Sequence, residues 1–150
     1  MNYWIGVVSH EHVQRGVAGG FVQINHGKLA PLRKMKADDG LVFYSPRESH
    51  PNGAPLQAFT AIGFIRAGDP YAYDMSLEGV PDFVPWRLNV DFLPCQLALI
   101  RPLVPQLEFI LSKSHWGAAL RFGHVKIANA DFSRIAAAMQ TQGSWHLPTL

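Results

Sequence analysis

The segment from Gln57 to Arg66 is the feature that most constrains the fold of this chain. It is rich in apolar, aromatic and β-branched side chains, which is typical of a β-strand, and it is too long for a turn. Gly63 lies inside the run, and glycine within a strand often marks a bulge or a tight bend. The segment therefore predicts a strand in a curved sheet, which is a feature of barrels.

Strands and short helices alternate along the rest of the chain without an internal repeat. The residue patterns predict strands at residues 3–8, 21–24, 41–45, 57–66, 83–93 and 122–127. They also predict a short helix that begins after Ser9 and ends at Gly19-Gly20, and a final helix that begins at Asn129 and ends at Gly143. Because the order has no βαβ rhythm, we expect an α+β fold: a small curved, partly closed β-barrel of about six strands with flanking short helices. We expect one domain over residues 1–143 and a C-terminal tail over residues 144–150.

Three of these segments have patterns that predict which side chains are buried. The apolar run from Leu41 to Ser45 predicts a strand that is buried on both faces. Alternation in residues 83–93 predicts one apolar face, with Trp86, Leu88, Val90 and Phe92, and one polar face, with Arg87, Asn89 and Asp91. Helical spacing predicts that the final helix buries Phe132, Ile135, Ala136 and Met139.

Composition excludes several classes of protein. Of the 150 residues, 48% are hydrophobic and 16% are charged, so we expect a sizeable core and no long disordered region. No apolar run approaches the roughly 20 residues that span a bilayer, and the first residues lack the pattern of a signal peptide. The single cysteine, Cys95, excludes an intramolecular disulfide and fits a reducing compartment. We therefore expect a cytoplasmic protein that does not contact a membrane.

Charge is unevenly distributed along the chain, although the net charge is only +2. Residues His12 to Ala37 include five basic residues and no acidic one, whereas Asp69 to Asp91 include five acidic residues and a single basic residue, Arg87. If the basic residues share a face, they form a positive patch that could meet phosphates or another polyanion. The other interpretation is a solvated basic loop, and the sequence leaves both open.

Residues that often carry catalysis or bind metals do not form a known motif. The chain has no glycine-rich phosphate-binding loop, and Ser9, His10 and Glu11 are consecutive, which prevents the mutual contacts of a catalytic triad. His10 and His12 flank Glu11, but residues two apart point to different sides of a helix, so a metal site is not favoured. A lone cysteine in an apolar segment, such as Cys95, is usually a small buried side chain. We therefore expect no enzymatic activity, no metal and no cofactor.

Aromatic, amide and hydroxyl side chains in this chain suit the recognition of a flat polar ring. Seven residues offer ring faces, namely Tyr3, Trp4, Phe43, Tyr44, Phe59, Trp86 and Trp116. The polar edge of a base could pair with Ser9, Gln23, Asn25 and Ser45. Because Trp and Tyr are usually buried for the most part, we expect roughly two or three of the rings at a pocket and the others in the core. Their spacing does not show which rings these are.

Several short motifs follow one another in order along nearly the whole chain. They are Tyr3-Trp4-Ile5-Gly6-Val7-Val8-Ser9, residues 20–28, residues 31–36 with Asp39-Gly40, Phe43-Tyr44-Ser45-Pro46-Arg47, residues 59–63, Trp116-Gly117, Arg121-Phe122-Gly123 and Asp131-Phe132. In this order they resemble the EVE domain family. One departure is Asp39-Gly40, because the family usually has Gly-Asp in the turn before the Tyr-Ser strand. The resemblance implies a PUA-like fold, with kinship to YTH and ASCH domains, which agrees with the curved sheet expected from the residues.

The resemblance also implies a function. EVE proteins are proposed to read modified bases, so we expect a non-catalytic nucleic-acid-binding module that recognises a modified nucleobase, such as methylated or hydroxymethylated cytosine, in DNA or RNA through an aromatic-lined pocket. The residues expected to bind the ligand are Trp4, Ser9, Gln23, His26, Lys28, Tyr44, Ser45, Arg87 and Trp116, with Arg33 and Arg47 expected to contact phosphates at the rim. The alternative is a binding protein or enzyme for a small soluble metabolite or nucleotide, which the near-neutral net charge favours.

Each of these residues also has an ordinary structural interpretation. Ser9 could cap the first helix, and Trp116 could fill the core. His26 and Lys28 lie beside Gly27, which could allow a ligand to approach closely or could form an ordinary turn. The two rim arginines could be solvated surface residues. The sequence does not decide between these roles, and it does not give the oligomeric state.

Overall fold

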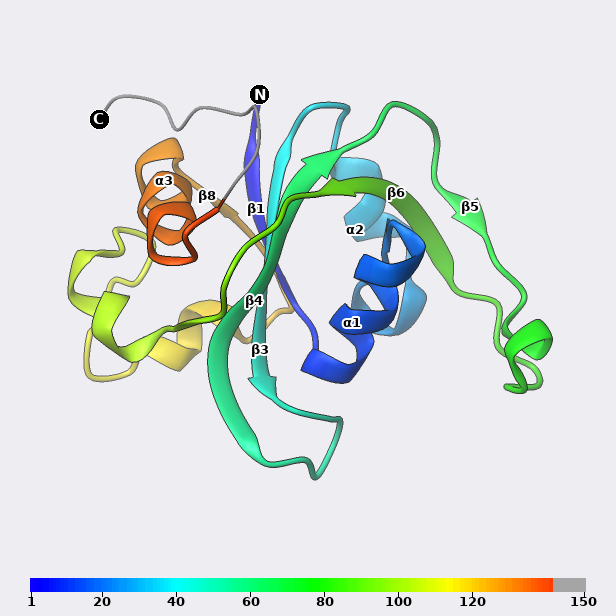
Figure 1. Cartoon of the computed structure of the whole chain (residues 1–150), viewed down its shortest axis with the longest axis horizontal. Helices are drawn as coiled ribbons and strands as arrows, with labels where there is room; N and C mark the ends of the chain where they lie inside the picture. Colours follow the sequence, from blue (N-terminus) through cyan, green and yellow to red (C-terminus); the bar gives the residue numbers. More distant parts are fainter. Residues whose placement is uncertain (142–150) are drawn as a thin grey trace.

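The fold is a strongly curved sheet with helices on both of its faces (Figure 1). The computed structural model describes residues 1–141. The strands are β1 (Tyr3–Val7), β2 (Phe21–Val22), β3 (Gly40–Arg47), β4 (Pro55–Ile65), β5 (Tyr71–Ala72), β6 (Trp86–Phe92), β7 (Ala98–Leu99) and β8 (His124–Ile127). The α-helices are α1 (His10–Gly19), α2 (Leu29–Lys34) and α3 (Asn129–Ala138), and the 3-10 helices are η1 (Asn25–Gly27), η2 (Met75–Glu78), η3 (Arg101–Gln106) and η4 (Trp116–Leu120). The expected α+β fold with a curved, partly closed barrel is confirmed.

The strands pair in the order β2-β6-β4-β3-β1-β8, with β5 added to β6 and β7 added to β4. β1 and β3 run parallel, whereas the other pairs are antiparallel. A parallel pair needs a crossover connection, and α1, β2 and α2 lie in the segment that connects β1 to β3. This crossover covers one face of the sheet, while α3 covers the other (Figure 1).

β4 contains the bulge that the sequence led us to expect, although not at the glycine. Phe43 and Tyr44 are consecutive in β3 but pair with Ala61 and Phe59, which leaves Thr60 as an extra residue in β4. Gly63 has a different role, because a Cβ atom there would lie 2.3 Å from the backbone oxygen of Asp91 in β6. The predicted strand is confirmed. Gly63, however, allows β6 to approach β4 closely and is not part of the bulge.

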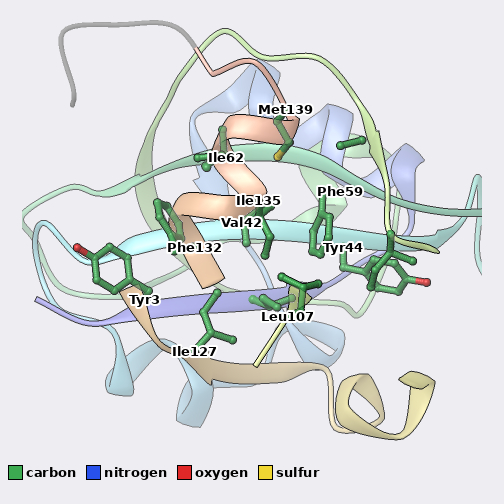
Figure 2. Close-up of a cluster of buried hydrophobic side chains, with 14 of the residues drawn as sticks. Tyr3, Val42, Tyr44, Phe59, Ile62, Leu107, Ile127, Phe132, Ile135 and Met139 are labelled. Carbon is green, nitrogen blue, oxygen red and sulfur yellow. The ribbon is translucent and has the colours of Figure 1, made fainter. Parts of the chain in front are cut away.

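β3 separates two apolar clusters because its side chains alternate between the two faces of the sheet. Val42 and Tyr44 belong to the cluster against α3 (Figure 2), and Leu41 and Phe43 belong to the cluster against α1 and α2. Residues Leu41 to Ser45 are each at most 3% exposed, which confirms the expected burial on both faces. The apolar face predicted for β6 is also confirmed, because the second cluster includes Trp86, Leu88, Val90 and Phe92.

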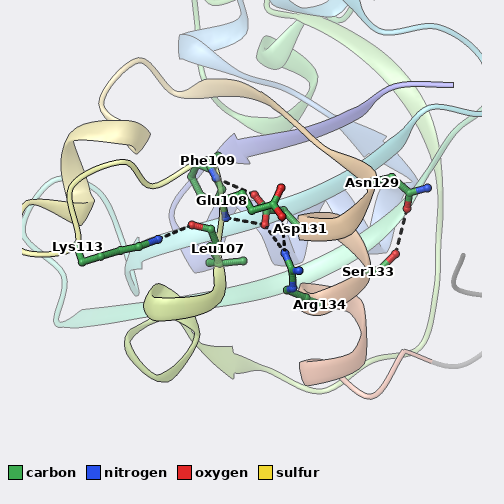
Figure 3. A network of polar contacts seen from close by, with 8 residues as sticks. All are labelled: Leu107, Glu108, Phe109, Lys113, Asn129, Asp131, Ser133 and Arg134. Carbon is green, nitrogen blue, oxygen red and sulfur yellow. Dashed lines mark hydrogen bonds and ion pairs between the residues drawn. The ribbon is translucent and has the colours of Figure 1, made fainter. Parts of the chain in front are cut away.

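α3 packs on the sheet through the face that its periodicity predicted. Phe132, Ile135, Ala136 and Met139 are all 0% exposed. In the first turn, the carboxylate of Asp131 accepts hydrogen bonds from the backbone N–H groups of Glu108 and Phe109, each at 2.8 Å, and pairs with Arg134 at 3.2 Å (Figure 3). These contacts attach the segment after η3 to the helix. α3 ends at Ala138, so the predicted helix end at Gly143 is wrong, and the tail over residues 144–150 lies outside the described residues.

Several short elements differ from the sequence-based predictions. α2 was not predicted, because its six residues include Pro31 and show no clear apolar period. The strand expected at residues 21–24 is only Phe21–Val22, since Ile24 already precedes the turn of η1. The last strand begins at His124. In the part of the chain that the structure describes, no helix has both the length and the apolar character needed to cross a membrane.

Candidate functional site

A cavity of about 730 Å³ lies on the face of the sheet that α1 covers. Its walls come from the end of β1, α1, the turn of η1 and the segment that leads from η2 into β6. Phe21, Phe43 and Phe83 supply ring surface, while Gln23 and Asn25 supply amide groups. Ligand pockets usually enclose about 300–1,000 Å³ and combine apolar walls with a few polar groups. The cavity therefore has the size and lining of a small-molecule or nucleobase site.

Ser9 lies where β1 passes into α1 and lines this cavity. Its backbone oxygen accepts a hydrogen bond from Val13 N–H at 3.0 Å, so α1 begins after Ser9 as predicted. Of the two roles left open for Ser9, a cap by its hydroxyl is wrong, because Oγ is buried and forms no hydrogen bond with any residue that the structure describes. A buried polar group without a partner costs about 1–3 kcal/mol. A ligand with a matching donor or acceptor would recover this free energy.

Arg87 forms part of the cavity wall and is held on several sides. Its guanidinium lies 3.8 Å from the ring centre of Phe21 and 3.9 Å from that of Tyr73, so two rings stack on its faces. Its Nε donates to Oε1 of Gln23 at 3.2 Å, and its Nη2 contacts Sδ of Met75 at 3.0 Å. Burial lowers the pKa of Arg87. The hydrogen bond from Arg87 to Gln23 also sets the orientation of the Gln23 amide, because Nε can only donate and must therefore face the amide oxygen. The NH₂ group of Gln23 remains available to a ligand.

Three histidines and an arginine also line the cavity: His12 and Arg15 on α1, His26 in the turn of η1, and His50 between β3 and β4. The ring centres of His26 and His50 are 5.9 Å apart. Burial lowers the pKa of His12, and the positive charge of Arg15 lowers it further. Among residues 1–141, no group of three or more His, Cys, Asp or Glu is placed to hold a metal ion. These side chains can instead donate hydrogen bonds to an anion.

Trp4 lies outside the cavity lining, within the apolar cluster beneath α1 and α2. Its ring stacks on His124 at 4.6 Å between centres, and its indole N–H donates to Asp39 at 3.0 Å. Burial alone would raise the pKa of Asp39, but hydrogen bonds from Asn2, Lys36 and Trp4 lower it overall. Trp4 therefore connects β1 to β8 through its ring and to the residue before β3 through its indole N–H.

Tyr44 and Trp116 lie on the opposite face of the sheet from the cavity, in and against the cluster beneath α3. Their rings meet edge to face at 6.4 Å, and Arg101 lies 5.4 Å from the ring centre of Trp116. Burial raises the pKa of Tyr44 to about 12. Ser45 is fully buried, and its Oγ bonds to Oγ1 of Thr60 at 2.8 Å. Tyr44 and Trp116 therefore lie on the other side of the sheet from Ser9 and Gln23, and Ser45 lies outside the cavity lining.

The residues expected in the loop at Gly27 and at the phosphate rim lie partly beside a cavity and partly on the exposed surface. Lys28 and Arg33 are exposed and lie outside the cavity lining. Arg47 lines a second, smaller cavity of about 150 Å³ that also borders Ser9, and its Nη1 donates to the backbone oxygen of Gly53 at 2.9 Å. The space beside Gly27 does not serve a ligand, because a Cβ atom there would lie 2.2 Å from Cβ of Pro85.

Sequence reasoning missed several residues of the cavity wall. The residue pattern marks Phe21 only as a strand residue, and it marks His12 only as a metal ligand that is not favoured. His50 gave no signal, because it lies in a connection rich in Pro, Asn and Gly. Arg15 could have been singled out, since it lies in the acid-free segment and on the same helix as His12.

A curved half-barrel with helices on both faces is the PUA-like fold that the resemblance implied. Solved structures share this fold. A crystal structure of a protein from Agrobacterium tumefaciens matches with a TM-score of 0.55 and 15% identity, over 91% of this chain and 92% of the other. A hypothetical protein from Leishmania major matches with a TM-score of 0.57 and 13% identity, over 93% and 95% of the two chains.

The family model for the EVE domain matches residues 2–138, and the chain belongs to this family. A UPF0310 protein from Mycolicibacterium vanbaalenii is 52% identical over 141 residues, which is 94% of each chain. The UPF0310 protein YdcG from Bacillus subtilis is 48% identical over 138 residues, which is 92% of each chain. The family expected from the ordered motifs is thus confirmed, and the names of these relatives state no enzymatic activity.

Proposed function

We propose that this EVE domain protein is a non-catalytic nucleic-acid-binding module that recognises a modified nucleobase, such as methylated or hydroxymethylated cytosine, in DNA or RNA. The observation that carries the proposal is the buried, unpartnered hydroxyl of Ser9 in the wall of a cavity that has room for a base. Ring walls and a polar side favour a ligand with flat apolar faces and a hydrogen-bonding edge. A nucleobase has this shape and chemistry.

The polar groups of the cavity complement such an edge. Gln23 offers its NH₂ group as a donor, because its oxygen already accepts from Arg87. Asn25 offers its oxygen as an acceptor, because its Nδ2 donates to the backbone oxygen of Phe122 at 3.3 Å. The hydroxyl of Ser9 can act in either role. A cytosine-like base presents an amino donor beside ring and carbonyl acceptors, so one donor, one acceptor and one hydroxyl suffice to orient it.

Cationic side chains near the cavity suit the phosphates that flank a base. Arg15 pairs with Glu11 at 2.6 Å, but both side chains are more than half exposed. Exposed pairs of this kind contribute about 0.3–0.5 kcal/mol, so a phosphate can compete for the arginine. His12, His26 and His50 add N–H donors at the same cavity. The base would thus be held in the cavity and its phosphate beside α1.

Binding to short single strands and duplexes that carry cytosine, methylcytosine or hydroxymethylcytosine tests this proposal. We expect tighter binding of a modified strand and weaker binding at higher salt, because phosphate contacts release counterions. Ser9→Ala should weaken binding, whereas Ser114→Ala, at an exposed position outside the cavity lining, should not. Equal, undetectable or salt-insensitive binding across the strands contradicts the proposal.

Thermal unfolding in the presence of nucleosides, nucleotides and common metabolites separates this function from the binding or conversion of a small metabolite. A ligand that binds only the folded state raises the unfolding temperature. We expect the shift from a modified nucleoside or nucleotide and its loss in Ser9→Ala. A shift produced only by metabolites unrelated to nucleobases would favour the metabolite-binding alternative.

A further inference from the structure

Phe122 is a large apolar side chain that the fold leaves in solvent beside the cavity. It is 79% exposed, although Phe is among the residue types most often buried. Its own backbone oxygen accepts the hydrogen bond from Asn25, a residue of the cavity wall. The exposed ring thus belongs to a segment that is bonded directly to the proposed base site.

The backbone around Phe122 is fixed against the cavity wall on two sides. Gly123 has a φ of 79°, and a Cβ atom there would lie 2.1 Å from Oδ1 of Asn25, so this position favours glycine. The oxygen of Gly123 accepts a hydrogen bond from the N–H of Val7, another wall residue, at 2.8 Å. The backbone position of Phe122 relative to the cavity is therefore set by two hydrogen bonds and by the close packing of Gly123 on Asn25.

The surroundings of Phe122 are suited to a polyanion. Residues 109–130 contain no acidic residue; Arg121 and Lys126 are exposed, whereas Lys113 donates to the backbone oxygen of Leu107 at 2.7 Å. The segment from His12 to Ala37 also lacks acidic residues. The hydrogen bond between Asn25 and Phe122 joins these two acid-free segments in space. Arg121, next to Phe122, is exposed. An exposed ring flanked by a cation is the usual means of holding a single-stranded nucleic acid.

We propose that Phe122 and Arg121 form a platform for the nucleotide that neighbours the base in the cavity, with the adjacent base stacked on the Phe122 ring and the intervening phosphate near Arg121. The inference rests on the proposed function and extends it, because it defines the ligand as a single-stranded segment of at least two nucleotides. The cavity selects the modified base, and the platform adds affinity that does not depend on sequence, since every base has a ring face.

The test compares one nucleotide with a short strand. The probes are hydroxymethyl- and methyl-deoxycytidine monophosphate, and single-stranded trinucleotides with the same base in the middle. In the unmodified protein the trinucleotide should bind more tightly than the monophosphate. Phe122→Ala should reduce the affinity for the trinucleotide by about 5- to 160-fold, the effect of removing one stacked base, and should leave the affinity for the monophosphate unchanged. Phe122→Trp should restore trinucleotide binding.

Leu111→Ala is the matched control, because Leu111 is 93% exposed and lies outside both cavity linings. If Phe122→Ala and Leu111→Ala affect trinucleotide binding equally, or if the trinucleotide binds no more tightly than the monophosphate, the platform is refuted while the cavity proposal stands. If neither probe binds, the proposed function fails and the platform fails with it. A change in sedimentation behaviour of Phe122→Ala without a change in trinucleotide affinity shows instead that the ring contacts a second copy of the chain.

Discussion

Substitution by alanine should affect stability differently at two buried serines, Ser45 and Ser9. Ser45 is 0% exposed, and its hydroxyl bonds to Thr60 at 2.8 Å. Ser9 is 9% exposed, and its hydroxyl forms no hydrogen bond within the described residues. Alanine at position 45 therefore removes a hydrogen bond and leaves the hydroxyl of Thr60 without this partner. Alanine at position 9 removes only a buried polar group, since the backbone oxygen of Ser9 still accepts from Val13.

The magnitudes follow from the cost of burying and pairing a hydroxyl. Losing one hydrogen bond in Ser45→Ala should lower the free energy of unfolding by about 1 kcal/mol, and by more if Thr60 cannot find another partner. Ser9→Ala removes a cost of about 1–3 kcal/mol, but it also removes the packing contacts of the hydroxyl, so the free energy of unfolding should stay unchanged or rise by up to about 1 kcal/mol. The two variants should therefore differ by about 1–2 kcal/mol. In a domain of this size this corresponds to roughly 2–8 °C in the unfolding temperature.

Urea unfolding followed by tryptophan fluorescence, with equal slopes in both variants, measures this difference. If Ser9→Ala destabilises the protein as much as Ser45→Ala does, the hydroxyl of Ser9 is satisfied within the protein and is not reserved for a ligand. The same variants should separate stability from function. Ser9→Ala should be the more stable of the two variants, because a polar group kept for a ligand often lowers stability. It should nevertheless bind the modified base less tightly than the unmodified protein, because the hydroxyl that would contact the base is missing.

Three further predictions concern other parts of the structure. Asp131→Asn should lower the free energy of unfolding in urea by at least about 2 kcal/mol, because two backbone N–H groups and Arg134 bind this carboxylate; Ser133→Ala, which removes a single contact to Asn129, should cost less. Burial, and to a smaller extent the charge of Lys34, lowers the pKa of His124 from 6.5 to about 4. As the pH drops, the unfolded chain therefore binds a proton at this histidine before the folded protein does. The free energy of unfolding should fall as the pH drops from 6.5 towards 4. His124→Phe, which keeps a ring against Trp4, should flatten this decline in urea midpoints measured from pH 7 to pH 4. Arg87→Lys should destabilise the protein by about 1–2 kcal/mol, because lysine keeps the charge but cannot stack as a plane between Phe21 and Tyr73; a double-mutant cycle with Tyr73→Leu measures that coupling.

The sequence predicted the elements whose apolar pattern is complete within one segment. β3 is apolar at consecutive positions and is buried on both faces, while β6 alternates and buries Leu88 and Val90. α3 buries Phe132 and Ile135 at helical spacing. In each case the local period decides which side chains reach the core. α2 and the two-residue β2 depend on contacts with distant segments, and their local patterns were too weak to define them.

The candidate site could be predicted only in part, because its residues are selected by the topology of the sheet. Four of the expected ligand-binding residues line the large cavity: Ser9, Gln23, His26 and Arg87. Phe43 and Tyr44 are consecutive, so they point to opposite faces, and the cavity lies on the face of Phe43. The sequence could not show which face this is, because the crossover through α1 decides it. For the same reason Trp116, on the other face, could not be excluded from the site.

The structure also changes the meaning of the charge distribution. Three of the five carboxylates in the acidic stretch have partners within the fold: Asp74 accepts from the N–H of Ser76, Glu78 accepts from the hydroxyl of Tyr73, and Asp91 pairs with Arg66. In the basic stretch, among the described residues, only Arg15 has an ion pair.

A small net charge is therefore compatible with local attraction of a strand at the cavity. A strand held by roughly two or three phosphates should show a slope of about −1.4 to −2.1 in log affinity against log salt concentration, at about 0.7 per phosphate for single strands. A much steeper slope would mean that the protein binds a long stretch of backbone, and the cavity would then not be what selects the ligand.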